Sequence, residues 1–340
     1  MSMVTLKDIA LEVGRSVTTV SRALSACSDV SPETIKHVQE TAARMGYVPN
    51  VLAQRLQKQS TDTIGVVTPI SSKGYAEPFF CDFLAGIGEA ASQAGLDLMV
   101  AYAREDENQI AVYRKLIEER KVDGFIINRT LREDPRIDYL RSVDFPFAVF
   151  GQVENQKDYS YIDEDGEFAM NLVADHLVDQ GHERIGCLCP PLTFTSAATR
   201  LRGLRAGLAR HGLTLDDTLI KEGCFEQQDG YLRTLALLDE ENPPTAVVGF
   251  NDLVAFGAIN AAKDRGLKVG KDFAVTGFDD IQMADFYRPP LTTIRQPIKE
   301  IGGQVTGLLL KQLQTRRKDV PFKHRQILLK PELIIRESSI

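Results

Sequence analysis

The chain has 340 residues, of which 43% are hydrophobic and 26% are charged. This length suggests two or three domains, and the composition is that of an ordinary globular protein. The formal net charge of −7 argues against a protein whose whole surface binds nucleic acid or an anionic membrane. It leaves open a small basic module on an acidic body, so charge has to be counted by segment.

No apolar run approaches the ~18 residues of a membrane span, and the N-terminus lacks the layout of a signal peptide. The five cysteines are widely spaced, which is typical of reduced thiols in a cytoplasmic protein. Cys187 and Cys189 do not form a C-x-x-C pair, and no second pair exists to complete a zinc site. We expect a cytoplasmic protein without a metal or cofactor, with these two thiols at alternate positions of one strand.

Residues 1–60 differ in charge from the rest of the chain. They hold seven Lys and Arg against five Asp and Glu, a net charge of +2, whereas the remainder carries −9. The sign changes beside the polar stretch Gln57–Thr61, which reads as a linker. The N-terminal segment is therefore expected to fold as a separate unit.

Three short helices are predicted in this segment from their start signals. Thr5 can cap the first, with Asp8 completing a capping box, and Gly14 ends it. Ser16 can cap a second helix that runs to about Leu24. Ser31 can cap a third, whose first position is a proline. Two short helices joined by a tight, glycine-containing turn form the helix-turn-helix pattern.

The second helix carries an informative polar face. Val20 and Leu24 point to one side and supply core, while Thr18, Arg22 and Ser25 lie on the opposite side. Short polar groups and one arginine suit base edges in a major groove. A solvent-exposed polar face is the alternative for an isolated helix. The turn, the helix caps and the net positive charge of the segment together favour DNA binding. Val17 is ambiguous, because it could pack in the core or reach a thymine methyl.

Five stretches of the N-terminal segment carry a known pattern, namely residues 4–10, Thr19–Leu24, Val30–Thr34, Gly46–Asn50 and Ala53–Leu56. In these stretches the chain resembles the LacI/GalR (lactose-repressor) family of bacterial transcription regulators. By this resemblance, Val17, Thr18 and Arg22 occupy base-reading positions. Phosphate contacts, which position a protein without reading sequence, fall by the same resemblance at Thr5, Ser16, Thr19, Ser21, Ser31, Tyr47 and Asn50.

One position departs from the family pattern. A small apolar residue usually follows the turn glycine, but Arg15 stands there. Arginine cannot fill a small apolar gap. Either the turn repacks, or Arg15 points outward and adds a DNA phosphate contact.

The resemblance makes residues 50–60 a hinge helix and linker between a DNA-binding domain at 1–49 and a core at 61–340. Ala53 and Leu56 match its DNA-contacting face, and Leu56 matches a leucine that is pushed into the minor groove. Such a wedge kinks the duplex at a cost of a few kcal/mol per unstacked step. The alternative is a plain linker helix with Leu56 facing the body. So short a segment is marginal as an isolated helix, which suits ordering on DNA.

From Thr63 onward, apolar strands alternate with helical stretches, in two consecutive runs. This pattern predicts parallel sheets covered by helices on both faces. The fold class is α/β, with an N-terminal helix-turn-helix domain and, by resemblance, a two-lobed core of the periplasmic-binding-protein type I. Lobe one is expected at about 61–161 plus 293–321, and lobe two at about 162–292 plus 322–340.

Catalytic motifs are not convincing anywhere in the chain. Gly86, Gly88 and Ala91 fit a G-x-G-x-x-A pattern, but a dinucleotide site needs it at a strand-to-helix turn. Here the pattern falls within a predicted helix, where glycines permit close packing. The five histidines show no metal-binding spacing, and neither a P-loop nor G-x-S-x-G is present. We expect no enzyme.

Ligand-binding candidates lie where strands end, because ligands of such sheets bind outside the carboxyl ends of the strands. Arginine forks, aspartates that accept two hydroxyl groups and aromatic faces would suit a sugar. Asn251 may equally only cap a helix, and Phe79 may be core. The effector candidates, most of them also implied by the resemblance, are Phe79, Phe80, Asn128, Arg200, Phe225, Asn251, Asp279 and Gln296.

The sequence thus predicts a homodimeric repressor of sugar-utilisation genes on a near-palindromic DNA operator. A small-molecule effector, expected to be a sugar on faint similarity to alpha-glucoside regulators, would bind between the lobes and change their angle. The chain ends without a leucine-repeat tail, which favours a dimer over a tetramer. The alternatives are a sugar-binding protein without a DNA-reading role and a nucleobase-responsive regulator.

Overall fold

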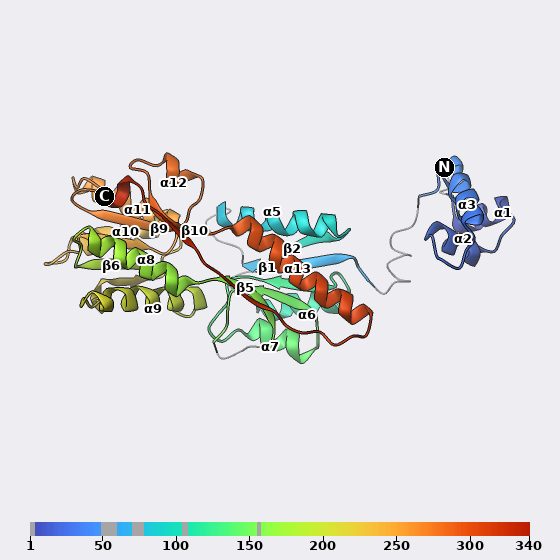
Figure 1. Ribbon diagram of the computed structural model, residues 1–340, viewed down its shortest axis with the longest axis horizontal. Helices are drawn as coiled ribbons and strands as arrows, with labels where there is room; N and C mark the ends of the chain where they lie inside the picture. Colours follow the sequence, from blue (N-terminus) through green and yellow to red (C-terminus); the bar gives the residue numbers. More distant parts are fainter. Residues whose placement is uncertain (1–3, 49–59, 70–77, 104–107, 155–157) are drawn as a thin grey trace. The chain divides into compact units, whose positions relative to one another are not determined.

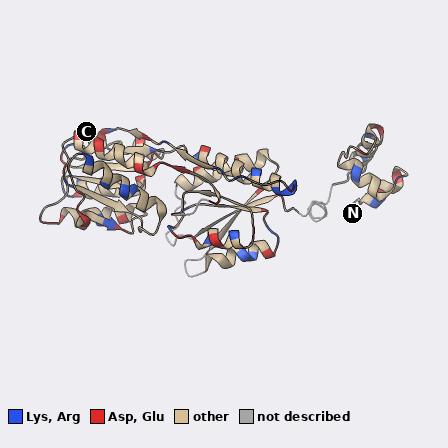
Figure 2. Ribbon diagram, turned by 60° about the horizontal axis from the view of Figure 1, so that its bottom comes forward, with Lys and Arg blue, Asp and Glu red and all other residues tan. Residues whose placement is uncertain are grey.

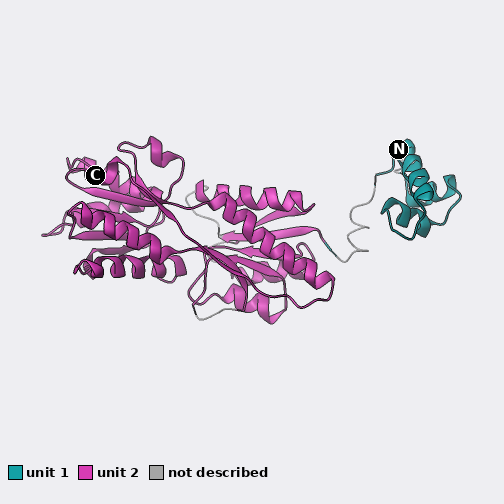
Figure 3. Ribbon diagram, viewed as in Figure 1, with its two compact units in different colours: residues 1–60 teal, residues 61–340 magenta. Residues whose placement is uncertain are grey.

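The computed structural model describes residues 4–48, 60–69, 78–103, 108–154 and 158–340. The chain forms two compact units, Met1–Ser60 and Thr61–Ile340 (Figure 3), here called the head and the body. Residues 50–59, where Asn50, Ala53 and Leu56 of the expected hinge helix fall, lie outside the described residues. Within the described ranges, no helix is long and apolar enough to span a membrane.

The head is the expected helix-turn-helix unit. Its helices are α1 (Leu6–Glu12), α2 (Val17–Leu24) and α3 (Pro32–Met45). Their apolar stripes meet in one small core around Ile9, Val20 and Val38, all fully buried. Gly14 has φ +61° and Gly46 has φ +70°, a left-handed backbone that glycine adopts at low cost. These two residues end α1 and α3 as the sequence predicts.

The body contains two six-stranded sheets, one in each lobe (Figure 1). Their strand orders are β2-β1-β3-β4-β5-β11 and β7-β6-β8-β9-β10-β12, so the two lobes repeat one topology. Every neighbouring pair is parallel except β10 with β12. The predicted α/β fold class with two similar lobes is confirmed.

The bounds of the elements follow from the hydrogen-bond ladders. Lobe one holds β1 (Thr63–Pro69), α5 (Pro78–Gln93), β2 (Asp97–Ala103), α6 (Gln109–Glu118), β3 (Gly124–Ile127), α7 (Pro135–Ser142), β4 (Phe147–Phe150), β5 (Ser160–Glu164), α13 (Ile298–Arg317) and β11 (Gln326–Leu329). Lobe two holds α8 (Gly166–Asp179), β6 (Ile185–Cys189), α9 (Thr195–Arg210), η1 (Asp217–Leu219), β7 (Ile220–Glu222), α10 (Gln227–Leu238), β8 (Ala246–Gly249), α11 (Asp252–Asp264), β9 (Ala274–Asp279), α12 (Met283–Phe286), β10 (Thr292–Arg295), β12 (Glu332–Ile334) and η2 (Glu337–Ser339).

The chain passes between the lobes later than the sequence suggests. Strand β5 belongs wholly to lobe one, because Ile162 pairs with Phe150. Strand β10 belongs to lobe two, because Thr293 pairs with Gly277. Strand β11 returns to lobe one and pairs with β5. The boundaries expected at 162, 293 and 322 therefore need correction to the ends of β5, β10 and β11. Which sheet a strand joins is decided by a distant partner, which local sequence does not specify.

Helices cover both faces of each sheet and pack in pairs. Helix α13 lies along α5 in lobe one, α8 lies along α9, and α10 lies along α11 (Figure 1). Cys187 and Cys189 are alternate residues of β6, both buried, as predicted.

The G-x-G-x-x-A motif lies inside α5 and mediates helix packing. A Cβ atom on Gly86 would lie 1.9 Å from the backbone oxygen of Lys299 on α13. A Cβ atom on Gly302 would meet the backbone oxygen of Phe83 at 2.4 Å. Gly88, in contrast, has only a side-chain carbon of Leu98 nearby, at 3.9 Å. Close backbone approach therefore explains Gly86, and the motif is not a dinucleotide site.

Gly86→Ala is expected to destabilise the body by about 1–3 kcal/mol or more, because overpacking must push α5 and α13 apart. This loss outweighs the ~1 kcal/mol that alanine gains over glycine in a helix. Gly88→Ala is the matched control and should be neutral or slightly stabilising. Urea unfolding of both variants measures the difference. Equal stability of the two variants would contradict the packing explanation.

Candidate functional site

The head presents three helix N-termini whose caps the sequence predicts. The backbone N–H and Oγ1 of Thr5 both donate to Asp8 Oδ2 at 2.8 Å. These bonds hold the pKa of Asp8 below its usual value. The hydroxyl oxygen of Ser16 accepts the backbone N–H of Thr19 at 3.1 Å, and that of Ser31 accepts the backbone N–H of Thr34 at 3.2 Å. The expected phosphate-contact residues at these positions therefore also stabilise the helices.

Helix α2 turns a polar face to solvent. Val20 and Ala23 are buried, while Thr18 is exposed and Val17 keeps 40% of its surface exposed. The position of Val17 therefore favours an outward role over a core role. Arg22 is half exposed and forms an ion pair with Asp29, so its guanidinium group must leave this carboxylate to meet a base.

The turn before α2 carries Arg15 at its surface. The Arg15 backbone N–H donates to Ala10 O at 3.1 Å, and its side chain is exposed. Of the two alternatives for Arg15, the structure has the outward side chain. Thr19 and Ser21 are partly exposed on α2, and Tyr47 packs partly against the head core.

The body holds a cavity of about 130 Å³ between its two lobes. Polar and aromatic side chains at strand ends line it, as expected for parallel sheets. Of the predicted effector residues, the cavity wall includes Phe79, Asn128, Arg200, Phe225, Asn251 and Asp279. Further wall residues, which the sequence analysis did not propose, include Thr130, Phe150, Asp163, Glu164, Phe194, Ser196 and Asp252.

Arg200 joins the two lobes across this cavity. From α9 in lobe two, its Nη2 donates to Glu164 Oε1 of β5 in lobe one at 2.7 Å. Its Nη1 donates to Phe250 O at 2.7 Å, and its guanidinium carbon lies 3.4 Å from the centre of the Phe278 ring. The guanidinium group of Arg200, which the sequence predicts to bind a ligand, is thus largely occupied by contacts within the protein. Nε is buried and lacks a protein partner among the described residues.

Asn128 and Asn251 both line the cavity, but their side chains differ in their hydrogen-bond partners. Asn251 caps α11 by accepting the Val254 N–H at 2.7 Å and donates to Phe225 O at 2.9 Å. Asn251 therefore both caps α11 and lines the cavity. The side-chain nitrogen of Asn128 is buried and lacks a partner within the described part of the chain. Together with Arg200 Nε, it leaves unsatisfied donors at the cavity.

Aromatic rings form the apolar part of the wall. Phe79 stacks on Phe150 with ring centres 6.0 Å apart, and Phe194 meets Phe225 edge to face at 5.8 Å. Phe80 does not line the cavity and instead packs against the lobe one core. It follows Phe79 on α5, and a helix turns each successive side chain by about 100°. The structure thus places Phe80 against the lobe one core, and a contact of Phe80 with an effector stays a prediction.

Asp279 stands at a strained corner after β9. Its φ is +118°, and the following Asp280 has φ +53°, values that cost energy for non-glycine residues and gather at functional sites. Gln296 Nε2 donates to Asp279 Oδ1 at 2.8 Å. Gln296 thus orients Asp279, and it borders an adjoining cleft together with Phe79 and Asp279. Its direct contact with an effector stays a prediction.

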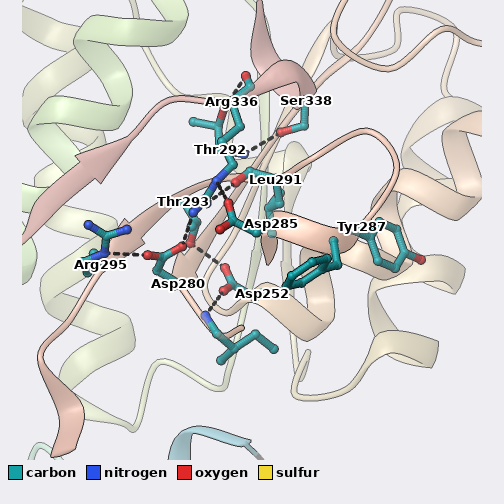
Figure 4. A network of polar contacts seen from close by, with 12 residues as sticks. Asp252, Asp280, Asp285, Tyr287, Leu291, Thr292, Thr293, Arg295, Arg336 and Ser338 are labelled. Carbon is teal, nitrogen blue, oxygen red and sulfur yellow. Dashed lines mark hydrogen bonds and ion pairs between the residues drawn. The ribbon is translucent and has the colours of Figure 1, made fainter. Parts of the chain in front are cut away.

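An ion-pair network holds this corner to two other strands (Figure 4). Asp280 accepts from Arg295 Nε at 2.6 Å and from Arg336 Nη2 at 2.8 Å. Arg295 ends β10, just before the chain crosses to lobe one, and Arg336 follows β12. Arg336 also bonds Asp285 at 2.6 Å. The corner that carries Asp279 is therefore tied to the segments that cross between the lobes.

Asp252 supports the same corner from α11. Its carboxylate is fully buried and accepts the backbone N–H of Ile281 at 2.8 Å and the hydroxyl group of Thr293 (Figure 4). Burial raises the pKa of Asp252 to about 7, while these two bonds act in the opposite direction. Nearby Asp280 raises that pKa further, and Arg336 lowers it.

This raised pKa predicts a pH-dependent stability. The folded protein holds the Asp252 proton more tightly than the unfolded chain, so the contribution is fully present below pH ~4 and is lost as the pH rises through ~7. Relative to Asp252→Asn, the wild type should lose up to ~4 kcal/mol between these limits, at ~1.4 kcal/mol per pKa unit. Urea unfolding of both proteins from pH 5 to 8 measures it. Parallel stability curves would contradict the prediction.

Asp163 and Glu164 were missed by the sequence analysis. They end β5, so the strand-end rule that selected Asn128 applies to them as well. Burial raises the pKa of Asp163 well above its usual value, and the adjacent Glu164 adds to the effect.

Two family descriptions match the chain. Residues 5–50 match bacterial regulatory proteins of the lacI family, and residues 174–339 match the periplasmic binding protein-like domain. The HTH-type transcriptional repressor PurR of Haemophilus influenzae is 31% identical over 342 residues, which cover 99% of this chain and 98% of PurR.

Solved structures agree with this match. The lac repressor dimer bound to operator and the anti-inducer ONPF is 30% identical with a TM-score of 0.85, covering 100% of both chains. The complex of the transcriptional regulator CelR with cellobiose is 28% identical with a TM-score of 0.75. This match covers 98% of this chain and 99% of CelR.

Proposed function

The chain belongs to the lacI family of bacterial regulatory proteins and is a DNA-binding transcriptional regulator, not an enzyme. We propose that it represses sugar-utilisation genes under the control of a neutral sugar. The sugar binds in the inter-lobe cavity. The observation that carries this proposal is the wall of that cavity, which combines the acceptor Asp279 and the unsatisfied donors of Asn128 and Arg200 with aromatic rings.

The charge of the wall favours an uncharged, hydroxyl-rich ligand. Of the two arginines in the wall, Arg200 already pairs with Glu164. The raised pKa values of Asp163 and Asp252 favour their neutral forms, so the wall offers little spare charge of either sign to a phosphorylated or carboxylated effector. Hydroxyl groups, in contrast, can donate to Asp279 and accept from Asn128 Nδ2. The similarity to the regulator CelR, solved with cellobiose, supports the same ligand class.

The proposed mechanism couples lobe angle to DNA binding. Two copies of the chain bind a near-palindromic operator through α2 of each head. Sugar binding favours one lobe arrangement, and the corner at Asp279–Asp280 passes this preference to the crossing strands through Arg295 and Arg336. Exposed Met283 and Phe286 on α12 and the similarity to the lac repressor dimer support self-association.

A thermal-shift screen tests the effector. Neutral mono- and disaccharides, sugar phosphates and purine bases would be compared, since a ligand that binds the native state stabilises it. We expect a neutral sugar to raise the melting temperature and sugar phosphates to have no effect. Stabilisation by a purine base alone would replace the sugar with a nucleobase, which could stack on one of the aromatic rings in the cavity wall.

Arg22→Ala tests DNA reading by α2. Specific binding to a duplex selected from a random library should weaken by about 1–3 kcal/mol, with relaxed preference at one base pair. Arg44→Ala is the matched control, since this exposed arginine pairs with Glu12 away from the expected base-reading residues. Fluorescence anisotropy gives both affinities. Unchanged affinity and preference in Arg22→Ala would favour a sugar-binding protein that does not read DNA.

A further inference from the structure

Lobe one ends in a strongly basic segment within an acidic body. Residues 311–325 hold six Lys and Arg and a single Asp, whereas the body as a whole carries −9. They span the last turns of α13 and the loop that leads to β11. Figure 2 shows Lys and Arg gathered at this end of α13.

The segment forms a groove of about 670 Å³, here called the basic groove. Its wall contains Lys311, Lys318, Lys323 and Arg325 and no carboxylate. All four side chains are exposed, and none enters an ion pair with the described parts of the chain. Four unpaired cations in one groove create a positive potential that attracts an anionic partner.

The neighbouring cations are used differently. Arg316 pairs with Asp144, and Arg317 pairs with Asp62 and Asp123 at 3.3 Å and 3.7 Å. Their charges are therefore partly neutralised inside lobe one. His324 in the groove has its pKa lowered by burial, so it is neutral at pH 7. The free positive charge of the groove belongs to its lysines and Arg325.

The basic groove lies at the end of the body where the chain arrives from the head. Asp62, which Arg317 contacts, is the second residue of the body. Thr61 donates to Asp123 beside it at 2.7 Å. The body therefore begins at this end of lobe one, and the head precedes it in the chain. Of the anions that could fill the groove, DNA is the one that the same chain binds through its head.

We propose that the basic groove binds the phosphate backbone of DNA that flanks the operator. These contacts carry no sequence information and add affinity by releasing counterions from the duplex. They compensate for the small net charge of +2 on residues 1–60. The acidic body is then not uniformly repelled by DNA, because one of its surfaces attracts it.

The test compares short and long DNA with the full-length protein. Duplexes of ~20 bp, about two helical turns, and of ~50 bp would both carry at their centre the site selected from a random library, and would be titrated by fluorescence anisotropy between 50 and 200 mM salt. In the variant Lys318→Gln/Lys323→Gln/Arg325→Gln, the slope of log K against log salt should fall by about 2–3 on the long duplex, at ~0.9 per lost phosphate contact. On the short duplex, which has no flanks, it should stay unchanged.

A matched variant separates the groove from bulk charge. Arg233→Gln/Lys268→Gln/Lys271→Gln removes the same charge from exposed positions of lobe two and should leave both slopes unchanged. An equal fall in both variants would overturn the proposal in favour of bulk charge. Unchanged slopes in the groove variant would overturn it in favour of another anionic partner, such as an acidic protein surface.

Discussion

Asp279→Asn is expected to abolish the response of DNA binding to the sugar while leaving DNA affinity without sugar within about twofold. Asp279 lines the inter-lobe cavity and can accept two sugar hydroxyl groups. Each hydrogen bond to a charged group contributes about 1.5–3 kcal/mol, so sugar affinity should fall ~100-fold or more. Asparagine keeps the shape of the side chain and tolerates the positive φ of +118° better than alanine does.

The measurement pairs calorimetric titration of the sugar with anisotropy of labelled DNA. Asp264→Asn is the control, because it removes the same charge from α11 at a site that only accepts from Tyr231. The control should respond to sugar as the wild type does. A normal sugar response in Asp279→Asn would remove this residue from the proposed site, whatever the identity of the effector.

Arg200→Met is expected to destabilise the body by about 3–5 kcal/mol, the cost of leaving a buried charge without its partner. Glu164 is only 5% exposed and would lose its cation. Arg200 also loses its bond to Phe250 O and its contact with the Phe278 ring. Because the pair joins β5 of lobe one to α9 of lobe two, its loss should also loosen the lobes.

The double variant Arg200→Met/Glu164→Gln checks the cause. Removing both charges should recover much of the loss, because an apolar or neutral replacement of a buried pair is often nearly neutral. Urea unfolding of the two single variants and the double variant closes the cycle. If Arg200→Met costs less than ~1 kcal/mol, or if the double variant is no more stable than Arg200→Met, the pair does not hold the lobes together.

The sequence predicts the head well because its determinants are local. Thr5, Ser16 and Ser31 cap helices through residues three positions away, and Gly14 and Gly46 end helices through their own backbone. The apolar stripe of each helix follows from a period of 3.6 residues. Such signals need no knowledge of distant contacts.

The cavity is predicted only in part. The strand-end rule selects Asn128, Phe225, Asn251 and Asp279, since it depends on where each strand stops. It cannot show that the Arg200 fork is already engaged by Glu164 or that Gln296 orients Asp279. These pairings join residues 36 and 17 positions apart, at distances that only packing sets.

The net charge of −7 shows the same division between what local sequence determines and what tertiary contacts decide. By itself the sequence determines that the chain has a basic N-terminal unit of helix-turn-helix type on a larger acidic α/β body, because charge, caps and periodicity are local properties. Only the tertiary structure decides that strands β5 and β11 join the sheet of lobe one and that β10 joins the sheet of lobe two. It alone also shows that Asp280 ties the Asp279 corner to Arg295 and Arg336. It also gathers four exposed cations, which have no ion-pair partner in the described part of the chain, into one groove at the end of lobe one. These arrangements depend on strand pairing and side-chain contacts between distant residues, which no local pattern encodes.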